Sequence, residues 1–600
     1  MAQRADDLVQ AGEPGSAIAA LKSQPQFHAF IAGLDQAVLA ELEASLEWFS
    51  VPAGATLFRQ GDAASDIYFV TAGRLGLLVD AGFGEQLIAH SLPGELVGEV
   101  ALLSNEPRSG TIVALRATEL VRMPIATAER LMSSSPELMR YMLRLLASRL
   151  ISTRRPAPKR AAKAIAVIAI DRVPLDQDMA HGLYREFAAL TQRTGLIDSA
   201  SSHLATGAIE ALEEQHDLVV YLAKDRSSPW SRRCLGQADR VIFVADAASI
   251  PDEEADQVIC AARAMHRPAD LVLLGRADAS QPHGATVWLD RFAPHEIFHV
   301  RRGHAADHAR VARLAIKRAV GVVFSGGGAR AFAHVGAVRA LYAAGIPVDL
   351  VGGTSMGAIV AATTAMARDA DEIGELFHFA FVKNKPLNDY TVPLISLFRG
   401  RNMSRLLHYK FGERTVENLW KVLFCVSANL STGSACIHQR GLVWRAVRAS
   451  AAIPGIVPPS VENGQVLVDG GIVNNLPTQV MRSLARGPVI GIDVATDMPL
   501  VATATDLEEK SIYWLARNRR TACPGIIEIL MRSGTAGSEE QKRANHSAVD
   551  LLIQPKLGPI GVLAFERFHD AVESGYRATM EAIERLDRGP DAGLWSFPGR

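Results

Sequence analysis

The chain has 600 residues, 48% of them hydrophobic, and a formal net charge of −1 at pH 7. This length predicts about three or four domains with sizeable cores, and the near-neutral charge excludes a global field that would attract nucleic acid. The 5 cysteines have neither paired nor metal-like spacing, and the N-terminal residues lack the order of a signal peptide, so we expect a protein of the reducing cytoplasm.

The first segments in chain order predict a small β-roll. Residues 1–25 are expected to be loosely ordered, and residues 27–49 carry apolar side chains at helical spacing. Short strands separated by glycine turns are predicted at 56–59, 66–70, 75–79 and 86–90, which is typical of an all-β barrel or roll. Helices over 129–149, split at Pro136, would close a domain that spans residues 26–151.

The stretches GELVGEVALL, from residue 94, and PRSGT, from residue 107, resemble the phosphate-binding cassette of cyclic-nucleotide-binding domains. By this resemblance Gly98 would let the backbone approach the ligand, Glu99 would accept from a ribose hydroxyl, and Arg108 beside Ser109 would pair with the cyclic phosphate. A cyclic nucleotide is therefore a candidate regulatory ligand. The alternative that stays open is a ligand-free roll that serves as a docking or regulatory module.

A basic, proline-containing segment, residues 152–163, is predicted to be a linker. Beyond it, strands and helices alternate, which predicts a small doubly wound α/β domain over 164–317. The predicted strands are 165–170, 218–222, 241–244 and 271–274, and the predicted helices are 179–193 and 205–215. The domain contains no Walker-type and no GxGxxG motif. Its histidines have no acidic or cysteine partners at ligand spacing, so we predict no metal site.

The stretch around which the rest is organised begins at residue 322 with an apolar strand, a glycine triplet and a helix over 331–344. A second strand, 348–351, then leads into Gly353-Thr354-Ser355-Met356-Gly357 and another helix. A G-x-S-x-G between a strand and a helix is the context of a nucleophile elbow, in which flanking glycines allow the tight turn. Ser355 would lie at a helix N-terminus, where the helix dipole favours developing negative charge. The uncharged run 350–367 fits this soluble fold better than a membrane span.

Two further elements would complete an active site around Ser355. Backbone N–H groups suited to an oxyanion come from Gly326, Gly327, Gly328, Ala329, Arg330 and Met356. Asp469 follows an apolar strand, 466–468, and precedes two glycines, so it is placed to face the site. Because His334, His378, His408 and His438 lie in no comparable setting, a Ser–Asp dyad is preferred over a triad, with Asp469 taking the proton of Ser355. The alternative is that Ser355 caps a helix and Asp469 forms a turn.

Together, GGGAR at 326–330, GTSMG at 353–357 and DGG at 469–471 resemble the patatin-like phospholipases. The stretches VRASAAIPG at 447–455 and NNLP at 474–477 resemble the bacterial neuropathy-target-esterase branch. The resemblance implies a three-layer α/β/α domain over 318–600 and a Ser–Asp dyad that needs no metal or other cofactor. It also implies hydrolysis of acyl esters in phospholipids or lysophospholipids, with transient peripheral contact at the inner face of the membrane.

The remaining catalytic-domain segments are less specific. Residues 391–409 mix aromatic, branched and basic side chains, which fits an acyl-binding wall, a membrane-facing lid or an ordinary amphipathic helix. Core strands are predicted at 422–428 and 489–494, a mostly helical tail at 538–586, and a frayed end from residue 595. Two other interpretations of the whole chain stay open: a nucleotide-sensing regulator with a weak or silent esterase domain, and a general carboxylesterase for small soluble esters.

Overall fold

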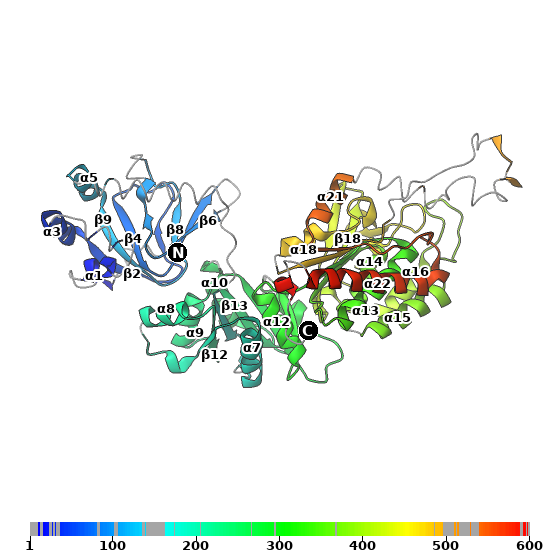
Figure 1. The fold of residues 1–600 in the computed structure, drawn as a ribbon, viewed down its shortest axis with the longest axis horizontal. Helices are drawn as coiled ribbons and strands as arrows, with labels where there is room; N and C mark the ends of the chain where they lie inside the picture. The colour runs from blue at the N-terminus through cyan, green and yellow to red at the C-terminus, as the bar shows by residue number, and fades with distance from the viewer. Residues whose placement is uncertain are drawn as a thin grey trace.

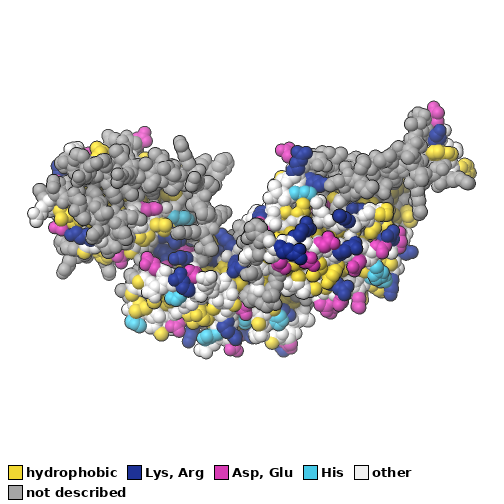
Figure 2. All heavy atoms as spheres, viewed as in Figure 1, with side chains coloured by type: hydrophobic (Ala, Val, Ile, Leu, Met, Phe, Trp, Pro, Cys, Tyr) yellow, Lys and Arg dark blue, Asp and Glu magenta, His cyan; other side chains and the backbone are white. Residues whose placement is uncertain are grey.

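The structure is a computed structural model with an elongated arrangement, in which a β-roll lies at one end, an α/β domain in the middle and a larger α/β domain at the other end (Figure 1). It describes residues 10–11, 16–22, 27, 31, 36–80, 85–100, 106–134, 139, 163–172, 175–204, 206–265, 267–292, 294, 296–366, 369–484, 486–495, 509–511, 513–514, 529, 539–588, 592–595 and 597. On the face drawn in Figure 2, basic and acidic side chains are interspersed over the middle and C-terminal parts, in keeping with the small net charge.

The N-terminal part is a roll of two antiparallel sheets, as predicted. One sheet has the order β1-β2-β9-β4-β7 and the other β3-β8-β5-β6. The strands are β1 (Gln10–Ala11), β2 (Glu47–Val51), β3 (Thr56–Phe58), β4 (Asp66–Ala72), β5 (Leu75–Asp80), β6 (Glu85–Ser91), β7 (Leu96–Val97), β8 (Thr111–Ala114) and β9 (Thr118–Pro124). The described helices are α1 (Ser16–Lys22), α3 (Gln36–Ser45) and α5 (Ile125–Ser134).

Two N-terminal expectations differ from the structure. Residues 16–22, expected to be loosely ordered, form α1, because Ala17, Ile18 and Leu21 are buried in the core of the roll. The helix predicted up to residue 49 ends at Ser45, and β2 begins at Glu47 with Phe49 in the core between the sheets. The first helix predicted from residue 129 is present as α5, which begins earlier, at Ile125, whereas the split at Pro136 and the linker up to residue 162 lie outside the described residues.

The middle domain is a six-stranded parallel sheet in the order β11-β12-β10-β13-β14-β15. Its strands are β10 (Ala164–Ala169), β11 (Thr194–Ile197), β12 (Leu218–Ala223), β13 (Arg240–Asp246), β14 (Ala269–Gly275) and β15 (Ile297–Arg301). Its helices are α7 (Gln177–Leu190), α8 (Thr206–Glu214), α9 (Pro229–Gln237), α10 (Glu253–Ala264), α11 (Ala285–Leu289) and α12 (Ala305–Ala315). The doubly wound class is therefore confirmed. The two strands that the sequence did not indicate, β11 and β15, are the edge strands, and their short sequences carry glycine, histidine or arginine among the apolar residues.

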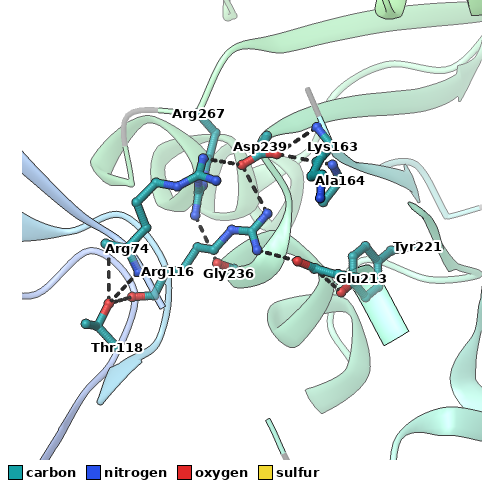
Figure 3. A network of polar contacts seen from close by, with 10 residues as sticks. All are labelled: Arg74, Arg116, Thr118, Lys163, Ala164, Glu213, Tyr221, Gly236, Asp239 and Arg267. Carbon is teal, nitrogen blue, oxygen red and sulfur yellow. Dashed lines mark hydrogen bonds and ion pairs between the residues drawn. The ribbon is translucent and has the colours of Figure 1, made fainter. Parts of the chain in front are cut away.

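Two arginines of the roll pair with two carboxylates of the middle domain (Figure 3). Arg116 donates to Glu213 Oε2 at 2.6 Å and to Asp239 Oδ1 at 3.0 Å, and Arg74 donates to the same Asp239 oxygen at 2.7 Å. Arg267 donates to the Gly236 carbonyl beside them, and burial lowers its pKa. Because a buried charge that loses its partner is costly, this cluster favours one orientation of the roll on the middle domain.

The C-terminal part contains an eight-stranded sheet in the order β20-β21-β18-β17-β16-β22-β23, with β19 also paired to β18. The strands are β16 (Gly321–Phe324), β17 (Leu350–Thr354), β18 (Val422–Asn429), β19 (Ser434–His438), β20 (Ser460–Glu462), β21 (Gln465–Asp469), β22 (Val489–Ile492) and β23 (Leu551–Ile553). The α-helices are α13 (Phe332–Ala343), α14 (Met356–Ala365), α15 (Ala370–Phe377), α16 (Arg401–Phe411), α17 (Val443–Ser450), α18 (Thr478–Leu484), α21 (Glu539–Ser547) and α22 (Phe568–Asp587).

The middle and C-terminal sheets share a layer of helices. Alternate residues of a strand face opposite sides of its sheet, so Val322 and Phe324 of β16 pack with α13, α14 and α22 on one side. Val323 faces the other side, where it lies in one core with Phe187 of α7 and Val311 of α12. The same core includes the inward side chains of β10, β12 and β13. The predicted α/β/α layering is therefore present, and its second helical layer comes largely from the middle domain.

Several C-terminal segments differ from expectation. Within 391–409, α16 begins only at Arg401, and the residues before it form a loop. The tail includes a strand, β23, which extends the sheet beside β22. Trp595, expected to be frayed, is 1% exposed and packs into the same core as α22. Burial of its large apolar ring holds this end of the chain in place. In the part of the chain that the structure describes, no helix combines the length and the apolar character that a bilayer crossing needs.

Candidate active site

Ser355 occupies a sharp turn between β17 and α14. Its backbone angles are φ 57° and ψ −127°, a conformation that costs a non-glycine residue energy and is typical of a nucleophile elbow. A Cβ added to Gly357 would lie 2.4 Å from the Phe324 carbonyl oxygen, and one added to Gly353 would lie 2.7 Å from the same atom. Both flanking glycines are therefore required by the close approach of β16.

Ser355 and Asp469 are in direct contact. The Ser355 hydroxyl donates to Asp469 Oδ2 at 2.5 Å, and the Gly471 amide donates to Asp469 Oδ1 at 2.8 Å. Asp469 ends β21, which pairs antiparallel with β18 and so brings residues far apart in sequence together. Burial raises the pKa of Asp469 to about 6, although the two hydrogen bonds favour its ionised form. The carboxylate is thus a stronger base than an exposed aspartate.

The glycine loop, residues 326–330, lies beside Ser355, and only some of its backbone amides are available to bind an oxyanion. The Gly326, Ala329 and Arg330 amides donate to the carbonyls of Asn475, Val562 and Gly327, respectively. Among the hydrogen bonds of the described residues, the amides of Gly327, Gly328 and Met356 have no protein acceptor. Gly328 and Met356 also line the pocket at Ser355. These amides are therefore the candidates for an oxyanion hole among the six residues that the sequence suggested.

Arg330 anchors the glycine loop. Its Nε donates to the Val494 carbonyl at 2.8 Å and its Nη1 to the Ile560 carbonyl at 2.9 Å. The side chain is thus committed to backbone acceptors rather than aimed at the serine. The geometry therefore gives the Arg330 side chain an anchoring role.

Two positioning residues were not identified as such from the sequence. The Ser355 amide donates to Ser450 Oγ at 2.9 Å, and that hydroxyl donates to the Val426 carbonyl at 2.6 Å. The Asn475 side chain donates to the Gly326 carbonyl at 3.3 Å. Both lie in stretches that carried the family resemblance, but neither spacing nor residue type indicates which member of each stretch reaches the site.

The histidines lie in other environments. His334 is fully buried, its Nε2 is 2.8 Å from the Ser325 carbonyl oxygen, and burial lowers its pKa to about 4. His438 contacts Ser427 at 2.7 Å. His378 packs against Phe568, and His408 against Trp444. No histidine in the described ranges forms a hydrogen bond with Ser355 or Asp469, and no cluster there has the composition of a metal site.

A narrow apolar pocket of about 40 Å³ lies at Ser355. Besides Ser355, Gly328 and Met356, it is lined by Ile359, Phe381, Leu387, Met403, Ala451, Ile453, Val562, Leu563 and Phe565. A larger cavity of about 730 Å³ lies in the middle domain, but its charged lining is engaged in ion pairs such as Arg226 with Asp252 and Glu254. The smaller pocket, which Ser355 lines, is therefore the candidate active site.

The residues of the nucleotide cassette also come together. Gly98 has φ 92°, and a Cβ there would lie 2.4 Å from an Arg108 nitrogen. Arg108 is buried over the ring of Phe58 and donates to the Asp66 carbonyl at 2.7 Å. Glu99, the residue after Gly98, is buried, whereas Ser109, the residue after Arg108, is exposed. The guanidinium is thus held in place by the protein, and burial lowers its pKa.

Three segments of the chain match family models. Residues 322–482 match the patatin-like phospholipase model, residues 48–135 the cyclic nucleotide-binding domain, and residues 189–320 the Neuropathy Target Esterase family P-loop like domain. An uncharacterized NTE family protein of Mycobacterium tuberculosis strain H37Rv is 30% identical, over 92% of this chain and 95% of the relative.

Longer relatives match over the same part of the chain. Patatin-like phospholipase domain-containing protein 6 of Homo sapiens is 27% identical over 92% of this chain, which spans 45% of that protein. Lysophospholipase nte1 of Aspergillus fumigatus is 27% identical over 92% of this chain, which spans 42% of that protein. The chain therefore corresponds to less than half the length of these two relatives.

Proposed function

The chain belongs to the neuropathy target esterase (NTE) family, and we propose that it hydrolyses acyl ester bonds of phospholipids or lysophospholipids, with Ser355 as nucleophile and Asp469 as base. The match to the patatin-like phospholipase model and the membership in this family support an ester hydrolase. The observation that carries the proposed chemistry is the 2.5 Å hydrogen bond from the strained Ser355 to the buried Asp469, beside an apolar pocket.

The reaction begins with transfer of the Ser355 hydroxyl proton to Asp469 as the oxygen attacks the acyl carbonyl carbon. The negative charge then develops on the carbonyl oxygen, where the amides of Gly328 and Met356 would stabilise it. The proton on Asp469 passes to the leaving alcohol, and an acyl-enzyme remains at Ser355. Asp469 next takes a proton from water, which attacks the acyl carbonyl; the proton then passes from Asp469 to the leaving Ser355 oxygen, so that the fatty acid is released and both residues return to their starting states.

The lipid class of the substrate is supported by the pocket. Its lining is almost wholly apolar, and methionine and phenylalanine side chains fit a flexible acyl chain. Two of the family relatives carry the names lysophospholipase and patatin-like phospholipase. Because such substrates reside in bilayers or micelles, we include a transient, peripheral contact with a lipid surface in the proposal.

The substrate proposal is tested by incubating the purified chain with phosphatidylcholine and with lysophosphatidylcholine and measuring the fatty acid released. Release from either lipid, absent in Ser355→Ala, supports the proposal. A rate on short soluble esters that exceeds the rate on both lipids, with no increase when the substrate aggregates, would instead favour a general carboxylesterase.

The pH dependence of ester hydrolysis is expected to follow the ionisation of Asp469, the proposed base. Burial raises the pKa of Asp469 to about 6, and only the carboxylate accepts the Ser355 proton. Activity is therefore expected to be constant at neutral pH and to be lost as the pH falls through about 6, with kcat/KM dropping about tenfold per pH unit below it. A pH–rate profile on a soluble ester measures this inflection. An inflection near the usual value of an exposed aspartate would contradict the assignment.

We also propose a cyclic nucleotide as regulatory ligand of the N-terminal domain, with Gly98, Glu99, Arg108 and Ser109 at the site. The buried Arg108 supports this, since a positioned guanidinium suits a phosphate. Calorimetric titration with cAMP and cGMP is expected to show binding that weakens about 10- to 100-fold in Arg108→Gln. No binding of either nucleotide would leave the roll as a docking module. Binding without any ester hydrolysis would favour the regulator interpretation.

A further inference from the structure

A closed loop, residues 390–398, precedes α16 in the catalytic domain. Tyr390 and Phe398 pair as an antiparallel bridge, and their ring centroids are 4.6 Å apart. The Thr391 amide also donates to the Leu397 carbonyl at 3.1 Å. The two ends of the loop are thus tied together, and Val392–Ile395 forms its tip.

The tip is apolar and exposed to solvent. Val392 is 73% exposed, Leu394 88% and Ile395 72%, and Pro393 between them is exposed as well. Isolated exposed apolar residues are ordinary, but a contiguous group marks a surface that contacts another apolar phase. None of these four side chains carries a hydrogen-bonding group, so the tip is suited to acyl chains rather than to a polar partner.

The base of this loop is continuous with the wall of the catalytic pocket. Leu387 and Ile453 line the pocket at Ser355. The same two side chains pack against the cluster of Phe398, Ile456 and Val457. A surface that receives the tip would therefore lie next to the pocket that holds the serine.

Basic side chains surround the tip in the sequence. Between residues 383 and 410 the basic residues are Lys383, Lys385, Arg399, Arg401, Arg405 and Lys410, and the one acidic residue is Asp389. The Asp389 carboxylate accepts hydrogen bonds from the backbone amides of Arg401 and Asn402, and it thereby caps the start of α16. Arg399, Arg401 and Arg405 are exposed. An apolar tip flanked by cations matches an anionic lipid surface, whose headgroups carry phosphate above an apolar interior.

We infer that the 390–398 loop docks the catalytic domain onto an anionic bilayer, with its aliphatic tip at the boundary between headgroups and acyl chains. The flanking arginines and lysines contact lipid phosphates. This rests on the proposed function, which it deepens by naming the element that meets the lipid surface. Docking in this way places the mouth of the Ser355 pocket against the bilayer, so that a lipid reaches the serine without first crossing water.

The test is co-sedimentation of the full chain with phosphatidylcholine vesicles, with and without phosphatidylglycerol. All variants carry Ser355→Ala, so that lipid hydrolysis does not change the vesicles. The double variant Leu394→Ser, Ile395→Ser is expected to lower the partition coefficient about tenfold or more, because two large apolar side chains no longer enter the bilayer. Ile250→Ser, a matched change at a 73% exposed isoleucine of the middle domain, should leave partitioning unchanged.

A second variant tests whether the exposed arginines contribute to binding of anionic vesicles. Arg399→Gln combined with Arg405→Gln is expected to weaken binding to the phosphatidylglycerol vesicles about fivefold for each arginine removed, with little change on pure phosphatidylcholine. Leu394→Trp gives an independent readout that does not depend on loss of binding. Its fluorescence should be quenched by brominated lipids more strongly than that of the parent chain.

Several outcomes would overturn the inference. They are the absence of binding to either vesicle type, equal binding by the tip variant and the Ile250→Ser control, or no additional quenching in Leu394→Trp. Loss of self-association in the tip variant, without any vesicle binding by the parent, would assign the tip to a protein contact instead. Loop-dependent vesicle binding by a chain whose wild type releases no fatty acid would leave docking in place while the proposed hydrolysis fails.

Discussion

Replacing Asp469 with asparagine is expected to lower kcat/KM for ester hydrolysis by about 10³-fold or more. Asparagine has nearly the same shape, and its amide oxygen can still accept the Ser355 hydroxyl. It cannot take the proton, however, so the serine attacks without a base. The fold should tolerate the change, because burial already disfavours the charged form of Asp469. The measurement is steady-state kinetics on a soluble ester, beside a thermal unfolding curve of each protein.

His438→Gln is the matched control for the dyad. His438 is buried and contacts Ser427, the residue that pairs with Asp469 across β18 and β21. If Ser355 and Asp469 act without a histidine, kcat/KM should change by no more than about threefold, while a loss as large as that of Asp469→Asn would show that a histidine shares the chemistry.

Removing residues 1–317 is expected to prevent the catalytic domain from folding. The truncation uncovers the face of its sheet that packs on α7 and α12, including the fully buried Val323, Phe424 and Val426. Burial of each such side chain contributes about 1.5–3 kcal/mol, so these three alone contribute about 5–9 kcal/mol, which is comparable to the whole stability of a domain, about 5–15 kcal/mol. Arg486, 2% exposed, also loses its ion pair with Asp270, which is costly for a buried charge.

A chain that begins at residue 163 is the control for this truncation. It keeps both sheets and the helices they share, and it loses the roll with Arg74 and Arg116. Glu213 and Asp239 would then be exposed to water, where an unpaired carboxylate is tolerated. We expect cooperative thermal unfolding of this longer piece and none for the shorter one. Cooperative unfolding of the shorter piece at a similar temperature would contradict the shared layer.

The sequence predicted the local features of the catalytic domain because they have local causes. Glycines at 353 and 357 bracket the elbow where a Cβ would collide with β16, and Gly345 has the positive φ, 67°, expected after a helix. The order of strands and helices followed from alternating apolar periods. These signals lie within a few residues of the feature they predict.

What the sequence did not predict depends on contacts between distant segments. The apolar faces of α7 and α12 show that these helices are buried, but not that two sheets cover them. Ser450 reaches the Ser355 amide from 95 positions away in the sequence. Trp595 is held by the core rather than by its neighbours in the chain. For residues 391–409 the sequence left an acyl-binding wall, a membrane-facing lid and an amphipathic helix open, because no local signal distinguishes them; the helix begins only at Arg401, and Pro393 favours a turn before it.

Labelling with a fluorophosphonate probe tests the central claim most directly, namely that Ser355 is a nucleophile activated by Asp469. The wild type is expected to be labelled rapidly, Ser355→Ala not at all, and Asp469→Asn about 10³-fold more slowly. His438→Gln should be labelled like the wild type. Undiminished labelling of Ser355→Ala, or equal rates for Asp469→Asn and the wild type, would contradict the account.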